Sequence, residues 1–195
     1  MATNNFLDSI NFQITNLQKG ALLVSEPMLP DPNFFRSVIL LTKHDPSGTV
    51  GFVLNHISVV NVDNVLPEFG VEGIPIFIGG PVGNDQLFFI HTLGHEISGT
   101  TEIMDGLFMG GDMEELETLL KTGLAATDQV RFFVGYSGWE EDQLALEVED
   151  NSWIVAETTP QQVMRDSDEY WKEVMSGLGK KFEVLSKFPS NPDLN

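Results

Sequence analysis

Short apolar runs separated by turn residues are the feature that most restricts what this chain can fold into. The runs are three to seven residues long, rich in Val, Ile, Leu and Phe, and bounded by Gly, Pro, Asn, Asp or other turn residues. Segments of this kind predict buried strands. The predicted strands cover residues 21–25, 36–42, 49–54, 75–78, 86–92, 107–109, 130–136 and 153–157.

Helical signals are fewer. Residues 112–123 predict a helix, because an aspartate that can cap its start precedes an apolar stripe and a glycine follows it. A second stripe predicts a helix that begins near 166–168 and is closed by the glycines at 177 and 179. Residues 143–149 fit either a strand or a short helix. The turn at 45–48 predicts a hairpin with a longer loop.

The strands outnumber the helices and do not alternate regularly with them. This order favours an α+β fold with a largely antiparallel, barrel-like sheet and flanking helices. A length of 195 residues suits one core rather than two. We therefore predict a single domain over 1–195, with a loosely held lead-in at 1–12 and a C-terminal tail at 187–195.

The net charge of −19 restricts the classes of partner. The chain has 10 Lys and Arg against 29 Asp and Glu, whereas nucleic-acid-binding proteins neutralise phosphates with basic side chains. We therefore expect no direct binding to nucleic acid, and none to acidic membrane surfaces. The charge either keeps the protein soluble or attracts a basic protein partner, for which the acidic region 101–150 is a candidate surface.

The compartment is predicted from two absences in the sequence. No run approaches the ~18 apolar residues of a membrane span, and the first residues lack the basic start and apolar core of a signal peptide. The chain has no Cys, which excludes disulfide and thiolate chemistry. These features predict a cytoplasmic protein without a cofactor.

Two glycine-containing motifs each have a structural and a functional interpretation. Residues 79–83, with the sequence GGPVG, follow a strand and predict either a tight corner or a place where a ligand approaches the backbone. They match neither a P-loop nor a dinucleotide fingerprint. Residues 135–139, GYSGW, resemble the nucleophile elbow of hydrolases, but Trp139 replaces its last glycine. A sharply turning strand end explains Ser137 better than a catalytic role.

The histidines and the acidic run give no metal site. His91 and His95 are four apart, but the residues before them predict a strand and Gly94 breaks helical spacing. The acidic run 140–142 lacks the alternating pattern of a calcium loop and predicts a solvated turn. We predict no metal and no catalytic residue.

Several spaced motifs together resemble the AlgH/YqgE family of bacterial proteins over nearly the whole chain. The matching stretches are 20–27, 31–41, 44–45, 48–55, 79–82, 135–139 with 143–144, 151–153 and 186–195. The resemblance implies an α+β fold around a small barrel-like sheet, supplies no catalytic residue, and implies at most an indirect regulatory role.

Four positions depart from the family pattern. His56 and Ile57 stand where the family commonly has Arg-Pro, and Asp142 stands where its turn usually has Gly. Position 137 is often Ala in the family, which argues further against a nucleophilic serine.

The leading hypothesis is a non-enzymatic binding or regulatory protein. Arg36 is expected to form a structural salt bridge rather than to bind an anionic ligand, and Asn55 to bond its own turn. The rival is a hydrolase whose cleft gathers His44, Asn55, Tyr136 and the corner at 79–82. The candidate binding residues are Arg36, His44, Asn55, Gly79, Gly80, Pro81, Val82, Tyr136, Gly138 and Trp139.

Overall fold

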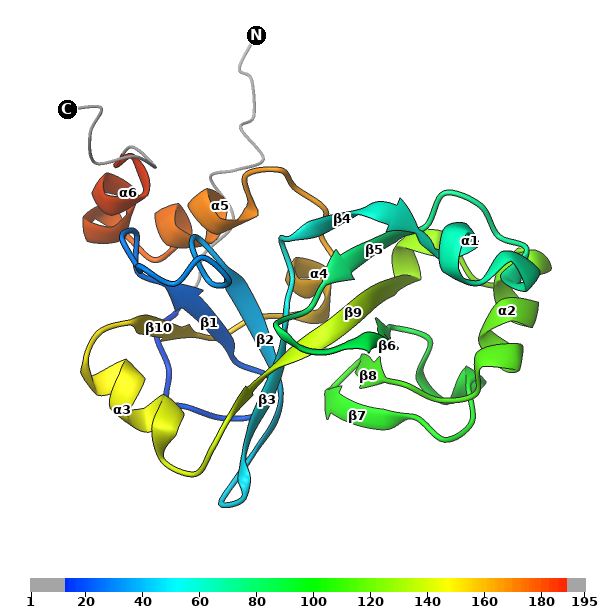
Figure 1. The fold of residues 1–195 in the computed structure, drawn as a ribbon, viewed down its shortest axis with the longest axis horizontal. Coiled ribbons are helices and arrows are strands. Elements are labelled where there is room, and N and C mark those ends of the chain that lie inside the picture. Colours follow the sequence, from blue (N-terminus) through cyan, green and yellow to red (C-terminus); the bar gives the residue numbers. More distant parts are fainter. Residues whose placement is uncertain (1–12, 189–195) are drawn as a thin grey trace, which may run out of the picture.

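The computed structural model describes residues 13–188, and within them ten strands form one sheet (Figure 1). The predicted lead-in at 1–12 lies outside the described residues, as does the predicted tail apart from Lys187 and Phe188. The strands are β1 (Leu22–Ser25), β2 (Val38–Asp45), β3 (Gly48–Val53), β4 (Ile57–Asn61), β5 (Pro75–Ile78), β6 (Val82–His91), β7 (Thr101–Met104), β8 (Leu107–Met109), β9 (Val130–Trp139) and β10 (Trp153–Ala156).

The sheet confirms the predicted α+β class. Its strand order is β10-β1-β2-β3-β9-β6-β8-β7, with β5 beside β9 and β4 beside β5. Every named pair is antiparallel except β5 with β9. The sheet is open rather than barrel-like, because the end strands β10 and β7 do not pair with each other.

Six α-helices and three short 3₁₀ turns complete the described chain. The α-helices are α1 (Val62–Val65), α2 (Met113–Lys121), α3 (Gln143–Glu149), α4 (Pro160–Val163), α5 (Tyr170–Gly177) and α6 (Lys180–Ser186). The 3₁₀ turns are η2 (Pro67–Phe69), η3 (Gly94–Glu96) and η4 (Thr127–Gln129). Asp112 caps α2 as predicted, since its side chain accepts bonds from the amides of Glu114 and Glu115.

The structure resolves one local ambiguity and corrects one local expectation. The ambiguous segment 143–149 is the helix α3. The hairpin between β2 and β3 has a short turn instead of a longer loop, because Asp45 pairs directly with Gly48 and only Pro46 and Ser47 lie between them. Strand pairing thus extends further toward the turn than the apolar run alone indicated.

Strands β1 and β2 are buried on both faces, which explains why they read as continuous apolar runs. Leu22 and Leu40 face a core shared with Trp171 of α5. Leu23 and Ile39 face the opposite core, which contains Leu144 of α3. A third core lies between α2 and the β5–β9–β6 half of the sheet. Strand β9 runs through the middle of the molecule and joins the two halves (Figure 1).

The helices of residues 13–188 are all too short or too polar to cross a lipid bilayer.

Candidate functional site

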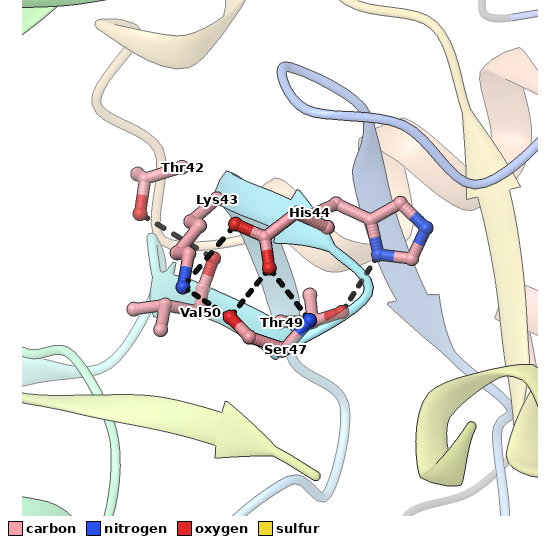
Figure 2. A network of polar contacts seen from close by, with 7 residues as sticks. Thr42, Lys43, His44, Ser47, Thr49 and Val50 are labelled. Carbon is pink, nitrogen blue, oxygen red and sulfur yellow. Dashed lines mark hydrogen bonds and ion pairs between the residues drawn. The ribbon is translucent and has the colours of Figure 1, made fainter. Parts of the chain in front are cut away.

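The β2–β3 hairpin carries His44 near its turn. Nδ1 of His44 lies 2.7 Å from Oγ1 of Thr49 on the neighbouring strand. Figure 2 shows the imidazole turned away from the side of the hairpin that holds Lys43 and Ser47. The side chain is exposed, and Thr49 therefore fixes the ring at the surface.

The Asp45 carboxylate lies on the other side of the hairpin, where it contacts Ser47 and Lys43. Its Oδ1 accepts bonds from the Ser47 amide at 2.8 Å and the Ser47 hydroxyl at 2.5 Å. Its Oδ2 lies 3.3 Å from Nζ of Lys43. The hydroxyl bond from Ser47, followed by the amide bond and with a smaller contribution from Lys43, lowers the pKa of Asp45. The carboxylate is thus ionised at neutral pH.

The turn from β9 into α3 is built around Asp142 and Gln143. Asp142 has a φ of 58°, in the left-handed region that favours glycine, which accounts for the glycine of the family pattern at this position. Oε1 of Gln143 accepts a bond from the Glu140 amide at 3.0 Å. The turn backbone is therefore held from within, and the side chains of Glu140 and Glu141 extend into solvent.

An open cleft of about 470 Å³ separates the hairpin from this turn. The two come together because Thr49 pairs with Trp139 across β3 and β9. Four lining residues are acidic and none is Lys or Arg, while four are apolar. The lining residues are Leu17, His44, Asp45, Pro46, Gly48, Thr49, Glu140, Glu141, Asp142, Leu144 and Ala145.

Glu147 links three elements next to the cleft and was missed by sequence reasoning. Its Oε2 accepts bonds from the indole nitrogens of Trp139 at 2.9 Å and Trp153 at 2.7 Å. Its Oε1 accepts a bond from Nε2 of Gln143 at 2.9 Å. One carboxylate thereby joins strand β9, helix α3 and strand β10. The motif residues Trp139, Gln143 and Trp153 therefore meet as a structural cluster.

The glycine corner at 79–82 is packed against strand β9. A Cβ on Gly79 would lie 2.4 Å from the Gly135 carbonyl oxygen, and a Cβ on Gly80 would lie 2.3 Å from the Tyr136 backbone. Both glycines are buried, whereas Pro81 and Val82 are exposed. The close backbone approach that the sequence predicted thus occurs against the chain itself.

Tyr136 and Gly138 belong to the same packed region. The Tyr136 ring makes an edge contact with Phe88, with centroids 5.9 Å apart. A Cβ on Gly138 would lie 3.4 Å from this ring. Ser137 is fully buried, and its hydroxyl donates to the Gly79 carbonyl at 3.1 Å. This position fits a strand residue and offers no route for a substrate.

Asn55 and Arg36 differ from their predicted roles. The Asn55 side chain does not bond its own turn: Oδ1 accepts from the Val38 amide and Nδ2 donates to the Arg36 carbonyl, both at 2.8 Å. Arg36 forms no salt bridge with any residue of 13–188, and Nη2 instead donates to the Phe188 carbonyl. Strand β2 begins just after Arg36, and the chain geometry places this carbonyl rather than a carboxylate beside the guanidinium.

The histidines of the suspected metal pair have other partners. Nε2 of His91 lies 3.1 Å from the Gly110 carbonyl, and Nδ1 accepts from the Leu93 amide at 3.2 Å. Burial lowers the pKa of His91. His95 is exposed and its ring contacts Phe108. In residues 13–188, no three His, Asp or Glu side chains are grouped closely enough to hold a metal ion.

Arg131 is a buried cation that sequence reasoning passed over. It is 5% exposed, and its guanidinium donates to the carbonyls of Leu54 at 3.1 Å and Arg165 at 2.8 Å. Its guanidinium carbon lies 4.5 Å from the centre of the Phe77 ring. Burial lowers the pKa of Arg131. A lone Arg within an apolar run was the only signal available.

The structure therefore separates the ten candidate residues into three places. His44 alone lines the cleft. Arg36 and Asn55 lie together at the start of β2. The remaining candidates lie along β9 and the corner packed on it, at Gly79, Gly80, Pro81, Val82, Tyr136, Gly138 and Trp139.

Comparisons with known proteins agree with this architecture. The AlgH-like family model matches residues 22–183. A UPF0301 protein of Bacteroides fragilis is 40% identical over 192 residues, covering 96% of this chain and 97% of its own, and one of Cytophaga hutchinsonii is 41% identical over 181 residues, covering 92% and 100%.

Two solved structures have the same fold. The crystal structure of a Corynebacterium diphtheriae protein matches with a TM-score of 0.75 and 27% identity, covering 96% of this chain and 100% of that one. The solution structure of the AlgH protein from Pseudomonas aeruginosa matches with a TM-score of 0.68 and 26% identity, covering 97% of each chain. The chain belongs to the AlgH-like, UPF0301 family.

Proposed function

We propose that this protein is a non-enzymatic, cytoplasmic binding or regulatory protein, and that its cleft between the β2–β3 hairpin and the β9–α3 turn holds a basic segment of a protein partner. The observation that carries this proposal is the composition of the cleft. Four acidic residues and no Lys or Arg line about 470 Å³ of open space, and of the four only Asp45 forms an ion pair within residues 13–188, with Lys43.

The apolar residues of the cleft favour a side chain over a simple ion. Lys and Arg have long aliphatic stems that pack on apolar surface while their charged ends stay in a polar environment. Leu17, Leu144 and Ala145 provide such a surface, and Glu140 and Glu141 provide the charge. The −19 net charge of the chain adds a long-range attraction for basic partners and repels nucleic acid.

The hydrolase alternative has less support. It needs His44 to meet Asn55, Tyr136 and the corner at 79–82, and these residues do not line the His44 cleft. Asn55 is occupied by two backbone bonds. A hydrolytic centre also needs a base within hydrogen-bond reach of a nucleophile or water that a substrate can approach. The hydroxyl that His44 contacts belongs to Thr49, which is only 3% exposed.

Isothermal titration calorimetry with an acetylated, amidated peptide of four lysines tests the proposal. We expect saturable binding at low salt that weakens as salt is raised, because exposed charges are screened beyond the Debye length of about 10 Å at 0.1 M salt. A peptide of four glutamines is expected not to bind. Equal binding of both peptides would contradict the proposal.

A pair of matched variants locates the binding site. Changing Glu140→Gln and Glu141→Gln together should weaken binding about fivefold, given the small value of each exposed ion pair. Changing Glu72→Gln and Glu102→Gln removes the same charge from exposed positions outside the cleft and should have little effect. An equal loss in both variants would show that only the net charge matters.

A further inference from the structure

Arg36 has no carboxylate partner among residues 13–188 and carries a buried nitrogen without an acceptor. The five ion pairs of this part of the chain all use other basic side chains. Its described hydrogen bond runs from Nη2 to the Phe188 carbonyl. Its Nε is buried and has no hydrogen-bond partner. A buried donor without an acceptor is rare in folded proteins and indicates a missing partner.

The backbone at Arg36 is held in an unfavourable conformation. Its φ is 50°, in the left-handed region that side-chain-bearing residues seldom adopt. Asn55 maintains it, because one end of the Asn55 amide holds the Arg36 carbonyl and the other holds the Val38 amide. Strain that the surroundings maintain in this way is concentrated at functional sites.

Two aromatic rings orient the guanidinium. Its carbon lies 5.4 Å from the centre of the Phe35 ring and 5.0 Å from that of Trp171. Trp171 is itself fixed, since its indole nitrogen donates to the Ser25 carbonyl at 3.0 Å. The arginine is therefore held by its ring contacts, and part of its donor capacity remains unused.

The neighbouring His56 does not neutralise or replace this cation. Its Nε2 lies 3.2 Å from Oγ of Ser37. Burial lowers the pKa of His56, although a bond to the Phe35 backbone opposes this shift. The His56 imidazole is therefore neutral at neutral pH, and Arg36 is the positive charge at the start of β2.

We propose that Arg36 is an anion-binding residue that takes a small oxyanion, a carboxylate or phosphate group, on the edge formed by Nε and Nη2. The planar guanidinium edge matches two oxygens of such a group. The oxyanion satisfies the buried Nε by displacing the Phe188 carbonyl from Nη2. The ligand is small, because the −19 charge of the chain repels an extended polyanion. This site is separate from the acidic cleft.

NMR titration of the arginine Nε–H signals tests the proposal directly. Inorganic phosphate and acetate are added in separate experiments, each replacing chloride at constant ionic strength. A saturable shift of the Arg36 Nε–H signal, together with the Trp171 indole N–H signal, is expected with at least one of them, and the difference between the two identifies the class of oxyanion. Shifts that are absent, or linear over the whole titration, would overturn the proposal.

Three variants distinguish bidentate binding of the oxyanion by Arg36 from attraction by any nearby positive charge. Arg36→Lys keeps the charge but loses the Nε edge, and it should weaken phosphate or acetate binding about tenfold. Arg36→Gly removes the side chain while relieving the positive φ, so it should fold and abolish binding. Lys181→Gln removes one positive charge from α6 as a control and should leave binding unchanged. An equal loss with Lys181→Gln and Arg36→Lys would overturn the proposal.

Discussion

The two ends of strand β2 carry opposite kinds of polar chemistry. Arg36 and His44 are eight positions apart along the chain, which corresponds to about 25 Å of extended backbone. At the first end, side chains reach buried backbone groups, as Asn55 does with the Val38 amide and Arg131 with the Leu54 carbonyl. At the second end, the carboxylates face an open cleft.

This difference shows that the number of charged residues in a region does not indicate whether they stabilise the fold or bind a partner. The packed end contains few charged residues, yet they position backbone and strands. The cleft end contains many acids whose removal should cost little stability. Substitutions at the packed end should therefore change the free energy of unfolding strongly, and those at the cleft end should mainly change binding.

The largest expected effect is at the glycine corner, next to the packed end. Gly80→Ala should lower the free energy of unfolding by about 4 kcal/mol, because the new Cβ meets backbone at 2.3 Å and the φ of 154° also disfavours a side chain. Urea unfolding measures the loss. Gly123→Ala is the control: its φ is 71° but nothing lies within 4 Å, so a loss of about 1 kcal/mol is expected. Similar losses for both variants would mean that contact with β9 does not matter.

Arg131→Met should have the next largest effect. It leaves the buried carbonyls of Leu54 and Arg165 without their donor, while it also removes the cost of burying a charge. We expect a net loss of about 2 kcal/mol in urea unfolding. An unchanged or higher stability would show that the buried cation is not needed to hold the α4–α5 segment on the sheet.

The pH dependence of stability tests two histidines, His56 beside the packed end and His91 at the end of β6. Burial lowers the pKa of His56 and of His91 below the value of about 6.5 in the unfolded chain. The unfolded state therefore binds protons first, and stability falls as pH drops from about 6.5 toward the lowered values. The urea midpoint should decrease between pH 7.5 and 5.0. His56→Gln with His91→Gln should reduce this decrease, and an unchanged decrease would exclude both histidines as its source.

The smallest expected effect is at the cleft end. Asp142→Gly should raise the free energy of unfolding by about 0.5 kcal/mol, because glycine adopts the φ of 58° without a steric cost. The same change removes one acid from the cleft and should weaken binding of the lysine peptide. Thermal unfolding and calorimetry measure the two effects. A loss of stability would mean that the Asp142 side chain, and not its backbone conformation, stabilises the turn.

The sequence predicted most of the strands but not their lateral order. Local apolar runs identified residues 75–78 and 107–109 with their observed bounds, because burial determines the composition of a strand directly. Sequence reasoning missed β4 and β7, whose residues are mostly exposed or half-buried. It also overestimated the hairpin loop, since turn residues mark a turn without fixing the register of the strands beside it.

The candidate site was predictable only in part. His44 was selected from the sequence, and the acidic run at 140–142 was noted as a solvated turn. Their proximity depends on the pairing of β3 with β9, which joins positions about 90 residues apart in the sequence, such as Thr49 and Trp139. No local pattern encodes such a pairing. The roles of Glu147 and Arg131 could not be predicted for the same reason. Glu147 bonds Gln143 on its own helix but also Trp139 and Trp153 on two strands, and Arg131 bonds carbonyls far away in the sequence.

The sequence by itself determined the α+β class, the acidic character and the family membership, because these follow from composition, short-range periodicity and ordered motifs. Only the tertiary structure decided which of the candidate groups are accessible to a partner and which are enclosed or hydrogen-bonded within the chain. Gly79 and Gly80 are enclosed by β9, and Asn55 is used by the backbone, whereas Glu140 and Glu141 border open space. The physical reason is that hydrogen bonding and burial depend on partners distant in the chain, and these are set only when the strands assemble.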